Sequence, residues 1–176
     1  MKSAKKEVLE ILIDKFKCVS CHKNPKMSYS ILACKNEHYI CLECVKDKTI
    51  RKCPICDINI KKQKPKRRYQ AEKISKVLLE FQQISVESTK AQFKKEIGTF
   101  VESKLDCFEC PVCFETIKAP LKIMSCTNDH YTCSDCLKSC SIKNCPICRE
   151  SFEKQEPKRR FLSENILSFL QKHVHK

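Results

Sequence analysis

The sequence predicts a small, metal-stabilised α+β fold in which two copies of one cysteine-rich module are each flanked by helices. Three observations indicate the two metal-stabilised modules and the flanking helices. The chain of 176 residues contains sixteen cysteines, an unusually high share for a globular domain. The cysteines recur with identical spacing at an offset of 92 residues, as expected for two copies of one structural unit. Apolar residues spaced three and four apart lie before and after each cysteine cluster, which is the pattern of amphipathic helices.

The repeat runs without a gap from the first cysteine pair to the basic segment that follows the last one. The stretch "CPICDINIKKQKPKRRY" at 53–69 returns as "CPICRESFEKQEPKRRF" at 145–161. The residue after the last cysteine differs, being Asp57 in the first copy and Arg149 in the second. We therefore expect five segments, namely an N-terminal helix at 1–17, a first module at 18–60, a basic turn and helical linker at 61–106, a second module at 107–152, and a basic turn with a C-terminal helix at 153–176.

Each module offers eight candidate metal ligands. A Cys-x2-Cys pair directs two thiolates at one metal, and zinc takes four such ligands in a tetrahedron. Each copy contains three such pairs and one Cys-x3-His. Because a module of about 45 residues buries too little apolar surface to fold alone, we predict two structural zinc ions per copy and four per chain. The predicted ligands are Cys18, Cys21, Cys34, His38, Cys41, Cys44, Cys53 and Cys56, then Cys110, Cys113, Cys126, His130, Cys133, Cys136, Cys145 and Cys148.

The flanking helices are predicted from their apolar stripes, which either pack locally or form a dimerisation face. The stripe before the first module contains Val8, Ile11, Leu12 and Phe16, and the stripe after it contains Ile74, Val77, Leu78, Phe81 and Ile84. The corresponding helix after the second module is expected to begin after Ser163 as its N-cap. Two cysteines fall outside the repeat, because Cys107 and Cys140 align with lysines, and we expect both to be free thiols.

Composition also narrows the environment of the chain. The N-terminal stretch is a poor secretory signal, because Glu10, Asp14 and Lys15 interrupt its apolar residues, and no apolar run is long enough to span a membrane. We therefore expect a protein of the cytoplasm and/or nucleus that makes no membrane contact and whose paired cysteines bind metal. The formal charge of +14 falls to about +8 once fourteen thiolates and four zinc ions are counted.

The order of the ligands in each copy, with histidine fourth among seven cysteines, resembles the RING finger of ubiquitin ligases. The segment "CTNDHYTCSDC", preceded by "FECPVCFETIKAPL" and followed by "CPICRESF", looks most like the seven in absentia branch, here present as a tandem pair. The resemblance covers both modules and the turns that follow them. It departs from the family at Glu37 and Asp129, where glycine usually precedes the ligand histidine. It implies a cross-brace, in which alternate ligand pairs share one zinc, although the spacing alone also allows a sequential arrangement.

The resemblance implies a function in ubiquitin transfer. A RING binds a ubiquitin-conjugating enzyme and holds its thioester-linked ubiquitin in a reactive pose, so catalysis comes from orientation, without a covalent intermediate. The family's contact surface combines an apolar residue inside the first Cys-x2-Cys, an apolar residue in the central helix and a proline inside the last pair. An arginine after the last cysteine often bridges the enzyme and ubiquitin. The second copy matches these positions with Val112, Leu137, Pro146 and Arg149.

The first copy matches the same surface less well. It keeps Val45 and Pro54, but it has Ser20 and Asp57 at the other two positions. We therefore expect an E3 ubiquitin ligase for an unknown protein substrate, in which the second module is active and the first is structural or binds a partner. The alternative is a non-catalytic zinc scaffold or adaptor, acting in the nucleus. The segment "KKQKPKRR" at 61–68 is typical of a nuclear import signal or a nucleic-acid patch, and without interleaved aromatic residues we expect such binding to be weak.

Overall fold

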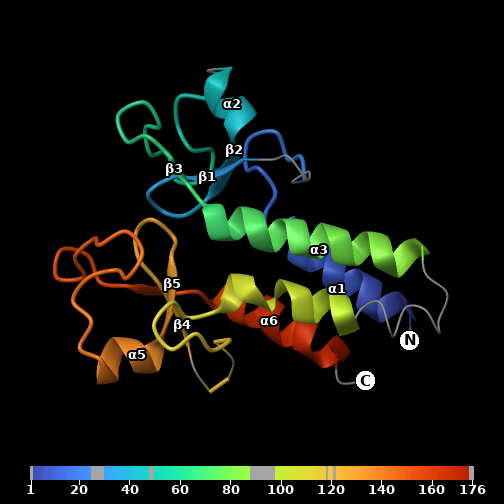
Figure 1. Ribbon diagram of the computed structural model, residues 1–176. Coiled ribbons are helices and arrows are strands. Elements are labelled where there is room, and N and C mark those ends of the chain that lie inside the picture. Colours follow the sequence, from blue (N-terminus) through green and yellow to red (C-terminus); the bar gives the residue numbers. More distant parts are fainter. Residues whose placement is uncertain are drawn as a thin grey trace. The chain divides into compact units, whose positions relative to one another are not determined.

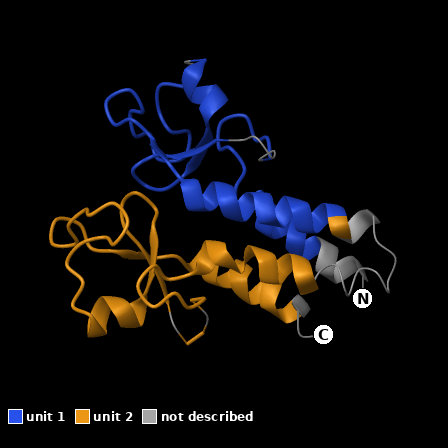
Figure 2. Ribbon diagram, in the orientation of Figure 1, with its two compact units in different colours: residues 1–83 blue, residues 84–176 orange. Residues whose placement is uncertain are grey.

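The structure, a computed structural model, describes residues 2–24, 30–47, 50–87, 98–117, 119–120 and 122–174. The chain divides into two compact units, residues 1–83 and 84–176 (Figure 2). Each unit contains one cysteine-rich module built on a small antiparallel sheet, and each sheet leads into a long helix (Figure 1). The predicted small α+β class, with two modules and flanking helices, is confirmed.

The first unit has a three-stranded sheet in the order β2–β1–β3. Both neighbours of the central strand run antiparallel to it, with Leu32 opposite Ile40 on one side and Arg67 on the other. The elements in chain order are α1 (Lys2–Asp14), β1 (Ile31–Ala33), β2 (Tyr39–Cys41), α2 (Leu42–Lys46), β3 (Lys66–Arg67) and α3 (Tyr69–Glu87).

The second unit repeats this arrangement with the strand order β5–β4–β6. On its central strand, Met124 pairs with Thr132 on one side and Arg159 on the other, which is the same register as at Leu32 in the first unit. Residues 98–104 are helical and lead into η1. The elements that follow are η1 (Leu105–Phe108), β4 (Ile123–Ser125), β5 (Tyr131–Cys133), α5 (Ser134–Ser139), β6 (Lys158–Arg159) and α6 (Phe161–Val174).

The basic segment after each module forms the third strand of the sheet, where the sequence predicted only a turn. The backbone N–H of Arg68 donates to the carbonyl of Ile31 at 2.8 Å, and Arg160 donates to Ile123 at the same distance. The strand side chains are exposed, and lysine and arginine suit such an edge because their charge discourages pairing with another chain. The basic segments therefore anchor the following helices to the sheets.

The helices bury one face each, but not always the predicted one. In α3 the predicted stripe is buried from Ile74 to Phe81. In α1 the buried face consists of Leu9, Leu12 and Ile13, and Phe16 in the turn after the helix continues it. This spacing of three and four turns Val8 and Ile11 towards solvent, so the prediction was wrong for these two residues.

Two further features bear on the helices. Helix α6 already begins at Phe161, so Ser163 lies inside its first turn and is not its N-cap. The Ser163 hydroxyl instead hydrogen-bonds the Tyr131 hydroxyl at 2.7 Å, which ties the helix to β5. Among the helices that the structure describes, none combines the length and apolar character needed to cross a membrane.

Candidate metal centres and the adjoining surface

The sixteen predicted ligands gather into four clusters, and within each cluster the ligand atoms lie within 4.8 Å of one another. The clusters are Cys18, Cys21, Cys41 and Cys44; Cys34, His38, Cys53 and Cys56; Cys110, Cys113, Cys133 and Cys136; and Cys126, His130, Cys145 and Cys148. The first and third ligand pairs of each module thus share one site, and the second and fourth share the other. The arrangement is crossed, which resolves the alternative that the spacing left open.

Two local structures present the ligands. In the first and last Cys-x2-Cys pair of each module, the backbone N–H after the second cysteine donates to the carbonyl of the first. These bonds measure 2.8–2.9 Å and involve His22, Asp57, Phe114 and Arg149, which all have φ between 55° and 60°. The middle Cys-x2-Cys pair of each module lies at the start of a short helix. The sulfur of Cys41 caps α2, and that of Cys133 caps α5.

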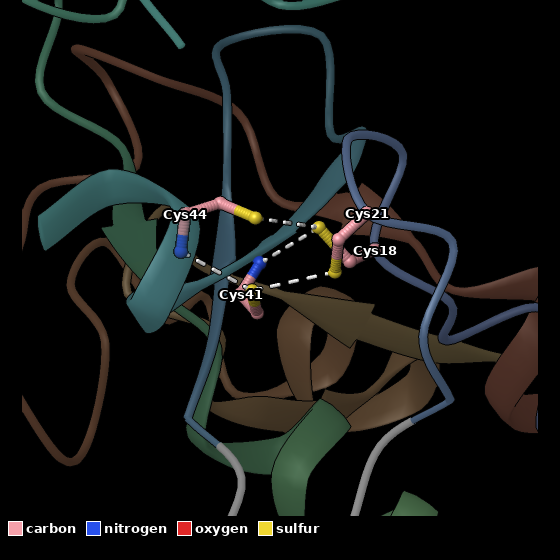
Figure 3. Close-up of side chains that lie close together, drawn as sticks. All are labelled: Cys18, Cys21, Cys41 and Cys44. Carbon is pink, nitrogen blue, oxygen red and sulfur yellow. Dashed lines mark hydrogen bonds between the residues drawn. The ribbon is translucent and has the colours of Figure 1, made fainter. Parts of the chain in front are cut away.

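The distances between ligand atoms fit zinc and exclude disulfides. With a Zn–S bond of about 2.3 Å, the edge of an S4 tetrahedron is about 3.8 Å. The sulfur atoms of Cys18 and Cys44 lie 3.9 Å apart, as do those of Cys21 and Cys41 (Figure 3). A disulfide needs about 2.05 Å. The clusters are therefore consistent with closed, tetrahedral structural zinc sites.

The two sites that contain a histidine have similar distances between their ligand atoms. The Nδ1 atom of His38 lies 3.6 Å from the sulfur of Cys34 and 3.5 Å from that of Cys53. In the second unit, His130 Nδ1 lies 3.5 Å from the sulfur of Cys126 and 3.7 Å from that of Cys145. Each histidine thus presents Nδ1 to its site, and the four clusters together are consistent with four structural zinc ions.

The pKa values of the clustered thiols indicate that a cation is needed to ionise all of them. Burial opposes ionisation of the Cys18 thiol, but the backbone N–H groups of Cys21, Cys41 and Ser20 lower its pKa to about 7. In the same cluster, burial and the neighbouring Cys41 thiol raise the pKa of Cys44 to about 12. Thiols this close cannot all ionise by themselves, because their charges repel. A bound divalent ion removes this conflict and deprotonates its ligands.

The left-handed position before each ligand histidine is occupied by an acidic residue, although glycine adopts this conformation most readily. Glu37 has φ 66° and Asp129 has φ 68°. Asp129 is buried, and its carboxylate lies 3.3 Å from the guanidinium of Arg160, which also donates to the Ser125 hydroxyl at 2.5 Å. In the first unit, the guanidinium of Arg68 lies 3.8 Å from the carboxylate of Glu37. The last arginine of each basic segment therefore supports the zinc loop, a role that the sequence analysis missed.

The four predicted contact residues flank ligands of the second module. Val112 lies between Cys110 and Cys113, and Leu137 follows Cys136 on α5, so both adjoin the all-cysteine cluster and both are half-buried. We call a Cys-x2-Cys turn together with the residue that closes it a knuckle. Pro146 and Arg149 belong to the last knuckle, Cys145 to Arg149, and are exposed. The Arg149 side chain makes no hydrogen bond or ion pair within the described part of the chain.

Two exposed apolar side chains extend this surface and were not predicted. Phe114 is the last residue of the first knuckle of this module, Cys110 to Phe114, and is 78% exposed. Ile147 lies inside the last knuckle and is 53% exposed. The available signal was their position inside or just after a Cys-x2-Cys turn, next to the predicted contact residues Val112 and Pro146. Cys107 and Cys140 join none of the four clusters among the described residues; Cys107 is buried and donates to the carbonyl of Lys104, and Cys140 is exposed.

Comparison with known proteins shows a partial similarity. No protein-family model matches the chain. The E3 ubiquitin-protein ligase RNF138 of Mus musculus is 35% identical over 79 residues, which cover 42% of this chain and 31% of the mouse protein. The Rattus norvegicus protein of the same name is 35% identical over 68 residues, covering 35% of this chain and 32% of the rat protein. The chain thus spans about a third of the length of these curated relatives, and it combines two zinc-binding modules with a distant, partial similarity to E3 ubiquitin ligases.

Proposed function

We propose that the chain is a RING-type E3 ubiquitin ligase whose second module binds a ubiquitin-conjugating enzyme and promotes ubiquitin transfer to a protein substrate. The first module has a structural or partner-binding role. The observation that carries this proposal is Arg149, which is exposed on the last knuckle of a crossed zinc module and is free to contact another molecule. The partial similarity to the RNF138 ligases supports the same reading.

The backbone conformation of Arg149 strengthens this argument. Its φ of 60° lies in the left-handed region, which costs a residue with a side chain about 1–2 kcal/mol. Asp57 at the equivalent position belongs to a residue type that tolerates this region better. An arginine brings no local advantage there, and its side chain makes no hydrogen bond or ion pair within the described part of the chain, so its position supports an intermolecular role. A guanidinium suits that role because its planar fork can bond two partners at once.

The knuckle that carries Arg149 is also braced more firmly than its counterpart. Asn128 donates to the sulfur of Cys148 at 3.4 Å, and the Thr127 hydroxyl hydrogen-bonds the carboxylate of Glu150, the next residue after Arg149. The first copy has Lys35 and Ile58 in place of Thr127 and Glu150, so it lacks the second bond. A fixed backbone reduces the entropy lost when Arg149 engages a partner.

In this proposal the contact residues and Arg149 have separate roles. Val112, Leu137 and Pro146 form the apolar contact with the conjugating enzyme, and Arg149 orients the enzyme-bound ubiquitin. The four clusters would hold zinc ions that stabilise the modules, and with four protein ligands each such ion would have no open position for a reacting group. The thioester belongs to the conjugating enzyme and the attacking amine to the substrate, so the chain itself forms no covalent intermediate.

A single-turnover discharge assay tests the proposal. Conjugating enzymes charged with ubiquitin are mixed with free lysine and the full zinc-loaded chain, and loss of the thioester is followed over time. We expect the chain to accelerate discharge from at least one enzyme, and Arg149→Ala to slow it by about tenfold or more. Enzyme binding should stay nearly unchanged, because the arginine acts mainly in the reactive pose.

The repeat supplies a matched control for each variant. Asp57→Ala makes the equivalent change in the first module and should leave discharge unaltered, and Leu137→Ala should weaken enzyme binding more than Val45→Ala. If Asp57→Ala slows discharge as much as Arg149→Ala, the assignment of activity to the second module is wrong. If no conjugating enzyme responds while the zinc content stays complete, the non-catalytic scaffold becomes the better reading.

A further inference from the structure

We propose that the first module carries a site for the phosphate backbone of nucleic acid, independent of base sequence. We call it the first basic turn and define it by six cationic residues on two adjacent segments, Arg51, Lys52, Lys61, Lys62, Lys64 and Lys66. The proposal concerns the module to which no role in ubiquitin discharge is assigned, and it stands whether or not the second module is a ligase.

The charges of the first basic turn are available to a ligand. All six side chains are exposed, and none forms an ion pair within the part of the chain that the structure describes. The two arginines that follow are different. Arg67 is held at 2.9 Å by Glu72, and Arg68 is buried next to Glu37. The cationic surface is therefore made by the six residues of the turn and not by the whole basic segment.

The backbone of the first basic turn is held in place. Lys52 and Asn59 form a β-bridge, and the N–H of the buried Ile60 donates to the carbonyl of Arg51 at 3.0 Å. The side-chain oxygen of Asn59 accepts from the backbone N–H groups of Lys61 and Lys62 at 3.0 and 3.1 Å. None of these bonds uses a lysine side chain. The cations are thus presented by a preorganised turn, which lowers the entropy cost of binding.

The second module has the same turn without the charge. Asn144 and Ser151 form the equivalent bridge, and Lys143 is paired with Glu153 at 3.9 Å. Across the six equivalent positions the second copy has three cations and two carboxylates, where the first copy has six cations. The fold therefore does not require the positive charge, and its concentration in one copy indicates a ligand for that copy.

The composition of the first basic turn favours nucleic acid over an acidic protein. Lysine is depleted in protein–protein interfaces, which depend on aromatic and apolar anchors. Five of the six residues are lysines. The neighbouring aromatic residue, Tyr69, has its ring covered by the Arg67 guanidinium at 4.6 Å, so its stacked face is not open to a base. Phosphate contacts alone bind without regard to sequence and weaken steeply with salt.

Fluorescence anisotropy with the full zinc-loaded chain tests the proposal. The probes are labelled mixed-sequence DNA of about 20 nucleotides, single-stranded and duplex, titrated between about 50 and 300 mM salt. With five or six phosphate contacts, the slope of log affinity against log salt should be about −5 on duplex and about −4 on single strands. Scrambling the base sequence should change the affinity by less than about twofold.

The charge differences between the copies define the variants. Lys61→Glu with Lys64→Glu gives these two positions the residues of the second copy. We expect a loss of roughly tenfold or more in affinity and a slope about two units shallower. Lys154→Glu with Lys172→Glu removes the same net charge from exposed positions in the second unit and is the control. Glu153→Lys with Glu156→Lys should create a second site and raise the affinity. Zinc content and ubiquitin discharge should stay as in the parent chain for all three.

Three outcomes would overturn the proposal. An equal loss from the first variant and the control would mean that net charge alone governs binding. Tighter binding to poly-glutamate of matched charge than to either DNA would assign the turn to an acidic protein. A slope near zero, or affinity that depends on base sequence, would exclude a phosphate-only site.

Discussion

At the scale of single residues, this chain places ordinary side chains where many proteins use glycine. Among the residues that the structure describes, seven non-glycine residues have positive φ, and six of these lie within or next to the zinc loops. They are His22, Glu37, Asp57, Phe114, Asp129 and Arg149. Such conformations persist where the surrounding structure determines the backbone more strongly than local preference does. Crossed zinc coordination would supply that constraint here, because both ligands of each loop would be tied to a metal.

The Arg149→Gly variant separates folding from function. Glycine relieves the left-handed strain at φ 60°, so we expect the free energy of unfolding to be unchanged or to rise by up to about 1 kcal/mol. Ubiquitin discharge should nevertheless slow as much as in Arg149→Ala, since both variants lack the guanidinium. Thermal unfolding and single-turnover discharge measure the two effects. A clear loss of stability in Arg149→Gly would show that the arginine side chain supports the fold.

At the scale of secondary structure, one carboxylate joins three elements in each unit. Glu164, in the first turn of α6, accepts a hydrogen bond from the N–H of Ile123 on β4 at 3.0 Å and pairs with Arg159 on β6 at 2.8 Å. Glu72 makes the same bonds to Ile31 and Arg67 in the first unit. Burial opposes ionisation of Glu164, but Arg159 and the Ile123 N–H lower its pKa overall. The helix, the central strand and the edge strand are thereby fixed together.

Replacing Glu164 should destabilise the second unit. Glu164→Ala leaves the N–H of Ile123, a buried residue, without its acceptor, which costs about 1–3 kcal/mol in the free energy of unfolding. Chemical denaturation measures this loss, and Glu156→Ala, at an exposed position, is the control. Because the folded pKa of Glu164 is lowered, the ionic part of its contribution is present at neutral pH and is lost as pH falls through that value. Equal stability of the two variants would contradict this account.

At the scale of the whole molecule, the metal ligands are a large part of the core. The buried cluster around the ligands of the first module contains five of its cysteines together with Ile40 and Ile60, and Val19, Val45 and Ile50 pack against it partly buried. The aliphatic core of so small a module cannot by itself offset the conformational entropy lost on folding. Zinc binding and folding are therefore expected to be one process in each module.

Metal analysis of the purified chain should find four zinc ions, and a strong chelator should unfold both modules. Circular dichroism during chelation follows the unfolding, and a metal-sensitive dye counts the released ions. Cys107→Ser and Cys140→Ser should each retain four ions, because neither cysteine joins a cluster in the described structure. Two or fewer ions in a fully folded chain would contradict the double-module architecture, and loss of an ion from either serine variant would show that the ligand assignment is incomplete.

The sequence predicted those features that depend on neighbouring residues. A Cys-x2-Cys turn is closed by bonds within five residues, so its spacing reveals a pair of ligands before any fold is known. The stripe from Ile74 to Phe81 follows from the helical period, and the repeat follows from counting. Where the stripe was assigned to the wrong face, at Val8 and Ile11, neighbouring apolar residues offered two overlapping faces, and packing selected the one containing Leu9 and Ile13.

The sequence by itself therefore determined that the chain has two copies of one module, sixteen candidate ligands and helices at the flanks. Only the tertiary structure decided which ligand pairs share a site, because Cys18 and Cys44 lie 26 residues apart in the sequence and are brought together by the fold. It also decided that Arg68 and Arg160 pair with carboxylates of the zinc loops while Lys61 and Lys62 remain exposed. Residue type and spacing are local properties, whereas the choice of partner and the exposure of a charge depend on how distant segments pack.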